Sequence, residues 1–263
     1  MARPITFLSD YGLQDEFVGV VHAVIAHKCR EARVIDLSHG VPRQSVLAGA
    51  LMLARALPYA PPGIHLAVVD PEVGARRRAV ALLTAQDERV LVGPDNGLLL
   101  PAAERFGGVF EAVEISHSPW RLEPVSATFH GRDLFAPVAA RLACGEALAD
   151  AGAPLEPGEL VGLEVPRPRR QEGVLVAHVM VVDGFGNVQL DATAADLGGR
   201  LGRTVRIGER EARYLRTFAD ADPGELLLYE DAAGMLALAV NGGEAAAELD
   251  GVAPGDELRL APS

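Results

Sequence analysis

The sequence predicts an α/β fold: an N-terminal α/β domain with a largely parallel sheet, followed by a smaller C-terminal antiparallel, barrel-like β domain. In the first half, short β-rich runs alternate with helix-like stretches, and parallel strands require crossover connections of this kind. Four prolines at positions 154, 157, 166 and 168 then interrupt the chain. Only short strand-like runs separated by turn residues follow them, which is typical of a small β domain.

The N-terminal α/β domain is expected over residues 1–160. Five β-rich runs are predicted to be its strands: Ile5–Leu8, Arg33–Leu37, Ile64–Val69, Val80–Thr84 and Val90–Val92. Three longer stretches have helical character: Phe17–His27, Gln44–Leu57 and Leu134–Leu142. The alternation of the two kinds of element predicts an α/β layer whose sheet is mostly parallel.

The proline-rich segment over residues 161–172 is expected to be an extended linker, because proline prevents a continuous helix there. The C-terminal β domain is expected over residues 173–263. Its predicted strands are Gly173–Val182, Leu226–Tyr229, Met235–Val240 and Glu257–Leu260. At 263 residues, the chain is long enough for one large and one smaller domain.

The composition is that of a globular protein, with 49% hydrophobic and 23% charged residues. The formal net charge of −12 argues against a nucleic-acid partner. No apolar run approaches the roughly 18 residues that a membrane-spanning helix needs. The sequence therefore predicts a cytoplasmic protein with no membrane segment.

The cysteines and histidines give no sign of a metal site or a disulfide framework. Cys29 and Cys144 lie inside helix-like segments without a CxxC spacing, so both are interpreted as buried thiols. The seven histidines show no HExxH or comparable spacing. Nucleotide-triphosphate, dinucleotide and serine-hydrolase motifs are also missing from the sequence. No metal and no cofactor are expected.

Asp10 lies in the loop Ser9-Asp10-Tyr11-Gly12, directly after the first predicted strand. In open α/β sheets, ligands bind beyond the carboxyl ends of the strands, where a carboxylate can accept hydrogen bonds from a ribose diol. The alternative is that Asp10 caps a turn, since aspartate at a strand end often does so.

Asp70 and Arg77 belong to the segment VVDPEVGARRR. Asp70 ends an apolar strand, and Gly74 permits a tight bend that can turn Arg77 back toward Asp70. An arginine beside a carboxylate orients it through paired hydrogen bonds. An ordinary surface ion pair is the alternative.

His130 precedes a predicted helix in the segment TFHGRDLFAPVAA. Asp133 is predicted to cap this helix at its N-terminus. Because Gly131 follows it, the imidazole of His130 can face a cleft rather than the core. A purely structural histidine is the alternative.

In the second domain, the segment Asp183-Gly-Phe-Gly-Asn187 combines an acid, an aromatic ring and an amide with two glycines, which allow a ligand to approach the backbone closely. These side chains suit an aminoacyl ammonium and an adenine. A β-turn between Val182 and Val188 is the alternative, since Asp-Gly favours hairpins.

Taken together, the motifs SDYG, VVDPEVGARRR, GPDNGLL, TFHGRDLFAPVAA and DGFGN resemble the S-adenosylmethionine hydroxide adenosyltransferase family, whose superfamily includes fluorinases and chlorinases. They occur in order from residue 9 to about residue 190, and AAGMLALAVNGGEAA extends the likeness toward the end of the chain.

The resemblance implies hydrolysis of S-adenosylmethionine to adenosine and L-methionine by attack of water-derived hydroxide on the ribose C5′. It implies a catalytic set of Asp70, Arg77 and His130, whereas halogenating relatives carry other residues at the first and last of these positions. It also implies a homotrimer whose active sites lie between the large domain of one subunit and the C-terminal domain of its neighbour. The implied substrate-binding residues are Asp10, Phe129, Asp183, Phe185, Asn187, Phe218, Val240 and Gly242.

One departure from the family pattern concerns the methionine end of the site. Relatives commonly have Asn-Ser before the glycine that corresponds to Gly234, whereas this chain has Ala232 and Ala233. Three alternatives to this function stay open: a non-catalytic S-adenosylmethionine or adenosine binder, a halide-using adenosyltransferase, and a metal hydrolase built on Asp10, Asp36 and Asp70.

Overall fold

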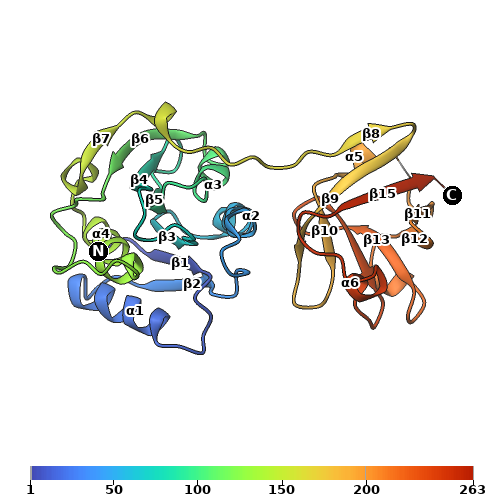
Figure 1. The fold of residues 1–263 in the computed structure, drawn as a ribbon, viewed down its shortest axis with the longest axis horizontal. Helices are drawn as coiled ribbons and strands as arrows, with labels where there is room; N and C mark the ends of the chain where they lie inside the picture. The colour runs from blue at the N-terminus through green and yellow to red at the C-terminus, as the bar shows by residue number, and fades with distance from the viewer. Residues whose placement is uncertain (1, 199, 263) are drawn as a thin grey trace. The chain divides into compact units, whose positions relative to one another are not determined.

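The structure, a computed structural model, describes residues 2–198 and 200–262. The chain forms two compact units, one up to Leu163 and the other from Glu164 onward (Figure 1). The first is mixed α/β and the second is a β-barrel, which confirms the predicted fold class, but the sheet of the first unit has as many antiparallel as parallel strand pairs and is not largely parallel. Within the described ranges, no helix is both long and apolar enough to cross a membrane.

The first unit is built on a seven-stranded sheet in the order β2-β1-β3-β5-β4-β6-β7. The pairs β1–β2, β1–β3 and β3–β5 are parallel, whereas the pairs β4–β5, β4–β6 and β6–β7 are antiparallel. The carboxyl ends of β1, β2, β3 and β5 therefore meet at one edge of the sheet. The strands are β1 (Ile5–Ser9), β2 (Val34–Ser38), β3 (Ile64–Val68), β4 (Ala79–Thr84), β5 (Val90–Pro94), β6 (Val109–Glu114) and β7 (Ala153–Leu155).

Helices cover both faces of this sheet (Figure 1). On one face, Phe7 and Leu66 pack toward α1 (Phe17–Lys28) and α4 (Ala136–Ala143). On the other face, Leu8 and Ala67 pack toward α2 (Val46–Ala56) and α3 (Leu100–Glu104). Because successive strand residues point to opposite faces and both faces are covered, the central strands are mostly apolar.

The helix after His130 begins earlier than the sequence suggests. A π-helical turn over Gly131–Phe135 leads directly into α4. Asp133 lies inside this turn, where its carboxylate accepts hydrogen bonds from the Ser126 amide and the Arg132 guanidinium. The prediction that Asp133 caps the helix is therefore wrong: its carboxylate instead holds the preceding loop. A π-helical turn inserted in a helix often marks a functional position.

The two cysteines form a disulfide, so the interpretation of both as buried thiols is wrong. Cys29 follows the last residue of α1, and Cys144 follows the last residue of α4. These helices pack against each other on the same face of the sheet. The pairing was not predictable from spacing, because the two residues are 115 positions apart and only the packing of the helices brings their Cα atoms to 6.0 Å.

The second unit is a closed barrel of seven strands in the order β10-β14-β13-β12-β11-β15-β9, with β9 returning to β10 and β8 (Arg169–Gln171) added outside β9. Most pairs are antiparallel as expected, but β12 and β13 are parallel. The barrel strands are β9 (Val174–Val182), β10 (Val188–Leu190), β11 (Thr204–Ile207), β12 (Arg210–Tyr214), β13 (Leu226–Glu230), β14 (Leu236–Val240) and β15 (Glu257–Pro262). Two short helices, α5 (Ala194–Leu197) and α6 (Ala245–Glu248), lie in its connections.

Candidate active site

The predicted catalytic residues come from loops at the carboxyl edge of the parallel strands. Asp70 lies two residues beyond β3, and Arg77 lies two residues before β4. His130 immediately precedes the π-helical turn that leads into α4. This edge is where open α/β sheets bind their ligands.

Asp70 and Arg77 form a buried pair. Arg77 Nε donates to Asp70 Oδ1 at 2.9 Å and to Oδ2 at 3.0 Å, and Arg77 Nη2 also donates to Oδ2. The side chains of Arg77 and Asp70 are only 4% and 5% exposed. The alternative of a surface ion pair is therefore wrong. A forked guanidinium–carboxylate contact of this kind fixes the orientation of both groups.

His130 joins this pair through Arg77, whose Nη2 lies 2.9 Å from His130 Nδ1. A guanidinium can only donate hydrogen bonds, so Nδ1 accepts and the proton of the neutral ring lies on Nε2. Burial lowers the pKa of His130, and the positive charge of Arg77 lowers it further, against the opposing effect of Asp70 and Asp133. The resting site therefore contains a neutral imidazole that presents Nε2–H as a donor.

Gly74 allows the two catalytic loops to pack together. Its φ of +79° lies in the left-handed region, and a Cβ atom there would come within 2.4 Å of the Ala127 carbonyl oxygen. The loop that carries Arg77 thus lies directly against the backbone of the loop that carries His130. Any side chain at residue 74 would both strain the bend and push the loops apart.

Tyr11 belongs to the same cluster, although sequence reasoning gave it no role. Burial raises the pKa of its hydroxyl, and the nearby carboxylates of Asp10 and Asp70 raise it further, while Arg77 opposes them. A Cβ atom on Gly131 would lie only 2.1 Å from the Tyr11 hydroxyl, so this hydroxyl touches the backbone next to His130. The Tyr11 hydroxyl is therefore protonated at neutral pH. Its position in the SDYG motif, next to Asp10, is the signal that could have identified it.

Phe129 lies in an aromatic group beside these residues. Its ring centroid is 5.2 Å from that of Phe17 and 5.9 Å from that of Tyr11, both in edge-on geometry. Phe17 is one of the larger apolar side chains that remain exposed in this unit. The group forms an apolar wall beside the polar cluster.

Asp10 lies in the loop after β1, and its Oδ2 accepts a hydrogen bond from the Gln44 amide at 2.9 Å. This contact joins the loop to a segment 34 residues further along the chain, so it is not the local turn cap of the alternative. Asp10 is only partly buried, and it still contributes its charge to the surroundings of Tyr11. One carboxylate oxygen is thus used to hold the two loops together.

In the second unit, the segment from Asp183 to Asn187 is the turn between β9 and β10, as the hairpin alternative predicted. Asp183 accepts from the amides of Phe185 and Asn187 and from the Asn187 side chain at 2.8, 3.0 and 2.9 Å. The Phe185 ring projects from this turn and is 80% exposed. These hydrogen bonds hold the turn together, and it presents an aromatic surface.

Two sets of contacts concern the other predicted binding residues of this unit. Gly186 contacts Glu244 closely, and its carbonyl accepts from the Ala246 amide at 3.0 Å, which places the turn against the segment that follows Val240 and contains Gly242. The Phe218 ring lies 4.9 Å from that of Tyr229. Burial raises the pKa of Tyr229 to about 12, with further contributions from the charges of Asp183 and Asp231.

Ala232 and Ala233 lie in the turn between β13 and β14. Asp231 organises this turn, because its Oδ1 accepts from the amides of Ala233 and Met235 at 2.8 and 3.0 Å. The backbone of the turn is therefore well supported even though both alanines lack polar side chains.

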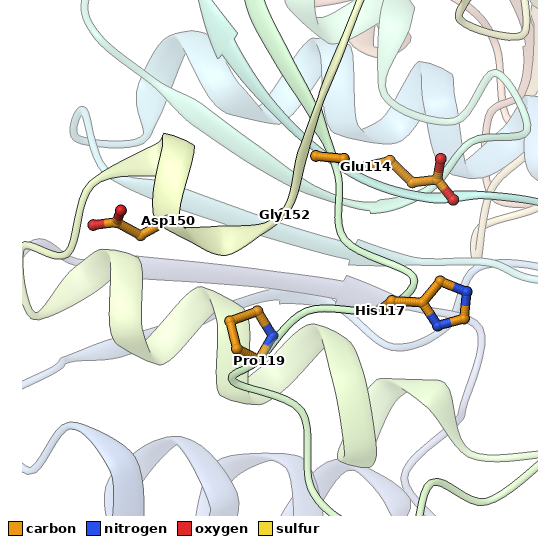
Figure 2. Close-up of a pocket in the computed structure, with 6 residues that line it drawn as sticks. Glu114, His117, Pro119, Asp150 and Gly152 are labelled. Atoms are coloured by element: carbon orange, nitrogen blue, oxygen red, sulfur yellow. The ribbon is translucent and has the colours of Figure 1, made fainter.

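A separate cavity of about 450 Å³ is lined by Glu114, His117, Pro119, Asp150, Gly152 and Ala153. It shares none of the predicted site residues. Figure 2 shows the Asp150 carboxylate pointing away from Glu114 and His117, so its charged groups do not converge. A binding site needs a few convergent polar groups, which this cavity does not provide.

The carboxylates of the metal-hydrolase alternative do not form one site. Asp10 is held by Gln44, and Asp70 is held by Arg77. Asp36 lies instead beside His22 and His39. The arrangement expected of a three-aspartate centre is not observed.

Comparison with known proteins agrees with the motifs. Residues 5–152 match the model for the SAM hydroxide adenosyltransferase N-terminal domain, and residues 177–259 match that for the C-terminal domain. A protein of Salinispora arenicola named (R)-S-adenosyl-L-methionine hydrolase is 53% identical over 97% of both chains. A Thermus thermophilus protein of the same name is 39% identical over 98% of this chain and 99% of its own. A fluorinase of an Actinoplanes species is 27% identical over 90% of each chain.

The fold is also found in solved structures. An uncharacterised conserved protein from Thermotoga maritima has a TM-score of 0.88 and 37% identity, covering 98% of this chain and 99% of its own. The match spans both units, as the two domain models do. The resemblance predicted from the motifs is thereby confirmed, and the chain belongs to the SAM hydroxide adenosyltransferase family.

Proposed function

We propose that this protein hydrolyses S-adenosyl-L-methionine to adenosine and L-methionine. The observation that carries the proposal is the buried cluster of Asp70, Arg77 and His130 at the carboxyl edge of the sheet. Relatives that are 39% and 53% identical are named (R)-S-adenosyl-L-methionine hydrolase, which supports it. Their names also suggest that the (R)-sulfonium epimer is the substrate.

The reaction places its main demand on the nucleophile. The C5′–oxygen bond forms as the C5′–sulfur bond breaks, and the bonding electron pair moves to sulfur, which leaves as the neutral thioether of methionine. No acid is needed to assist this departure, because the leaving group is already cationic. Bulk water has a pKa of about 15.7, so the site must favour loss of a proton from the attacking water.

The cluster has the groups for this task. His130 Nε2–H would donate to the water oxygen and orient it, because Nδ1 is occupied by Arg77. Asp70 is the anion of the cluster and would receive the water proton, while Arg77 holds the Asp70 carboxylate in place. Hydroxide and sulfonium neutralise each other in the transition state. Burial of the cluster favours this step, since attraction between opposite charges increases as the dielectric falls.

The substrate would be held by residues of both units. Asp10 would bind the ribose hydroxyls, and Phe129 would line the pocket beside them. Asp183 would bind the methionine ammonium, and Asn187 would bind adenine between the rings of Phe185 and Phe218, with backbone groups of Val240 and Gly242 completing the site. We further propose a homotrimer in which the two sets of residues come from neighbouring subunits.

Product analysis in ¹⁸O-labelled water tests the function. Purified protein is incubated separately with the (R) and (S) epimers, and the products are separated and analysed by mass spectrometry. We expect adenosine and methionine, with the label in the adenosine 5′-hydroxyl and faster turnover of the (R) epimer. Activity should survive prior treatment with a chelator, since no metal or cofactor takes part.

The same assay separates the alternatives. Binding of the substrate without any adenosine would show a non-catalytic binding protein. Formation of a 5′-halogenated adenosine when fluoride or chloride is added would show halide transfer. Unlabelled adenosine would exclude attack of water at C5′.

The rate should depend on pH through His130. Its pKa is lowered by burial and by Arg77, so the imidazole is neutral above the ordinary value of about 6.5 and remains neutral somewhat below it. As the pH falls through this lowered pKa, the ring gains a proton and Nδ1 no longer accepts from Arg77. We expect kcat/KM to be level above pH 6.5 and to fall on the acid side, with a midpoint below 6.5.

Stopped assays of adenosine release across pH 4–9 measure this profile, with circular dichroism over the same range to exclude unfolding. In the His130→Gln variant, the kcat/KM of the remaining activity should no longer fall on the acid side, or should fall only at a lower pH. A midpoint above 6.5, or an unchanged fall on the acid side in that variant, would contradict the assignment.

A further inference from the structure

Three side chains of metal-binding type converge at the outer edge of the sheet in the first unit. His22 comes from α1, Asp36 from β2, and His39 follows the end of β2 (Figure 1). His22 Nε2 lies 2.8 Å and His39 Nε2 lies 3.0 Å from the same oxygen, Asp36 Oδ1. One potential ligand atom from each residue lies within 4.8 Å of the other two.

His39 provides an independent sign that this cluster binds a ligand. Its side chain is only 3% exposed, yet Nε2 has no hydrogen-bond partner among the described residues. The 3.0 Å distance from Nε2 to Asp36 Oδ1 is that of an ion pair, but this contact is not among the hydrogen bonds of the structure. A buried polar atom without a partner calls for an explanation, and an ion between the two rings supplies one.

The surroundings of His39 are those of a metal ligand. Its other nitrogen, Nδ1, lies 2.8 Å from the hydroxyl of Ser9, which is completely buried. The Phe7 ring packs edge-on against the imidazole, with centroids 4.6 Å apart. Metal-binding histidines are typically held in this way by a hydrogen bond to the second ring nitrogen, which leaves the first nitrogen aimed at the ion.

We propose that His22, Asp36 and His39 bind a divalent zinc-type ion, with water completing its coordination. Two imidazoles and one carboxylate suit such an ion, whereas magnesium and calcium prefer oxygen ligands. Bonds of about 2.0–2.1 Å in a tetrahedral zinc site separate neighbouring ligand atoms by roughly 3.3 Å, so the two contacts need to open by only a few tenths of an ångström. The side chains of His22 and Asp36 are 34% and 43% exposed, which leaves the ion accessible from solvent.

The ion would stabilise the structure and take no part in the reaction. The His39 carbonyl accepts from the Gly12 amide at 2.8 Å, and its ring contacts Ser9. His39 is thus attached at two points to the loop that contains Asp10. An ion that fixes His39 would therefore make this loop more rigid, while the Asp70 cluster would be unaffected.

Zinc binding to metal-free full-length protein tests the proposal. After chelator treatment and dialysis, zinc chloride is titrated by isothermal titration calorimetry, and thermal unfolding is recorded with and without zinc. We expect one equivalent to bind and the unfolding midpoint to rise. His22→Ala and Asp36→Ala should each weaken this binding at least tenfold and remove the thermal shift. Hydrolysis by the metal-free protein at saturating S-adenosylmethionine should be unchanged.

Two histidine variants serve as matched controls. His27→Ala removes an exposed histidine from the same helix. His178→Ala removes a barrel histidine that lies beside Asp191 and Glu257. Both should bind zinc like the unaltered protein. The proposal is overturned if the unaltered protein binds less than a tenth of an equivalent, if His22→Ala binds as well as it does, or if binding disappears in either control.

Discussion

Replacing His130 by alanine is expected to slow adenosine release by roughly 10²- to 10³-fold while leaving the affinity for S-adenosylmethionine within a few-fold, as loss of one preorganised donor typically does. In the proposed mechanism, His130 contacts the attacking water and not the substrate. Its removal would therefore raise the barrier for displacement without affecting the residues that hold the ribose, adenine and methionine. Single-turnover assays give the rate, and calorimetry with the slow variant gives the affinity.

Replacing Arg77 should also slow adenosine release with little change in substrate affinity, and it should lower the stability of the protein as well. Arg77→Ala would leave the buried Asp70 carboxylate unpaired, and breaking a buried ion pair in this way costs about 3–5 kcal/mol. Arg77→Lys keeps the charge but loses the fork that contacts both Asp70 and His130. The lysine variant should therefore fold and still be slow.

Neighbouring residues of the same type provide the controls. Arg76 is exposed next to Arg77, and His27 is exposed at the end of α1, so alanine at either position should leave the rate unchanged. If His130→Ala and Arg77→Lys both retained the rate of the unaltered protein, the cluster would not be the catalytic one.

The fold of the first unit was predictable largely because its central strands are buried on both faces. Residues 64–68 are apolar apart from His65 and are completely buried, so the strand is apparent without tertiary information. Strands β11 and β12 were missed, because exposed arginine and glutamate alternate there with single buried residues over only four or five positions. Their membership in the barrel depends on neighbours that come from distant parts of the chain.

The candidate site shows the same division between local and long-range signals. The Asp70–Arg77 pair could be predicted, because Gly74 between them indicates a bend within seven residues. The position of Tyr11 among Asp10, Asp70 and Gly131 depends on three segments that only the fold brings together. The same is true of the cluster of His22, Asp36 and His39, which has no spacing that a motif search would recognise.

Replacing Gly74 by alanine should reduce turnover by about 10²-fold, although residue 74 contacts neither substrate nor water, because a displacement of about 1 Å in a catalytic group can have an effect of this size. The new Cβ atom would come within 2.4 Å of the Ala127 carbonyl oxygen, so the Arg77 loop and the His130 loop would have to separate. The contact between Arg77 Nη2 and His130 Nδ1, now 2.9 Å, joins these two loops and should be weakened first.

Gly108→Ala separates this effect from backbone strain. Gly108 has a φ of +85°, close to the +79° of Gly74, but a Cβ atom at residue 108 would have no neighbour within 4 Å. In both variants the left-handed conformation, which is unfavourable for alanine, should cost roughly 1–2 kcal/mol of unfolding free energy, and Gly74→Ala should lose more because of its clash with Ala127. Only Gly74→Ala should also lose activity, since only there does the added methyl group push the catalytic loops apart. Equal activity in the two variants would mean that the packing of these loops does not control the reaction.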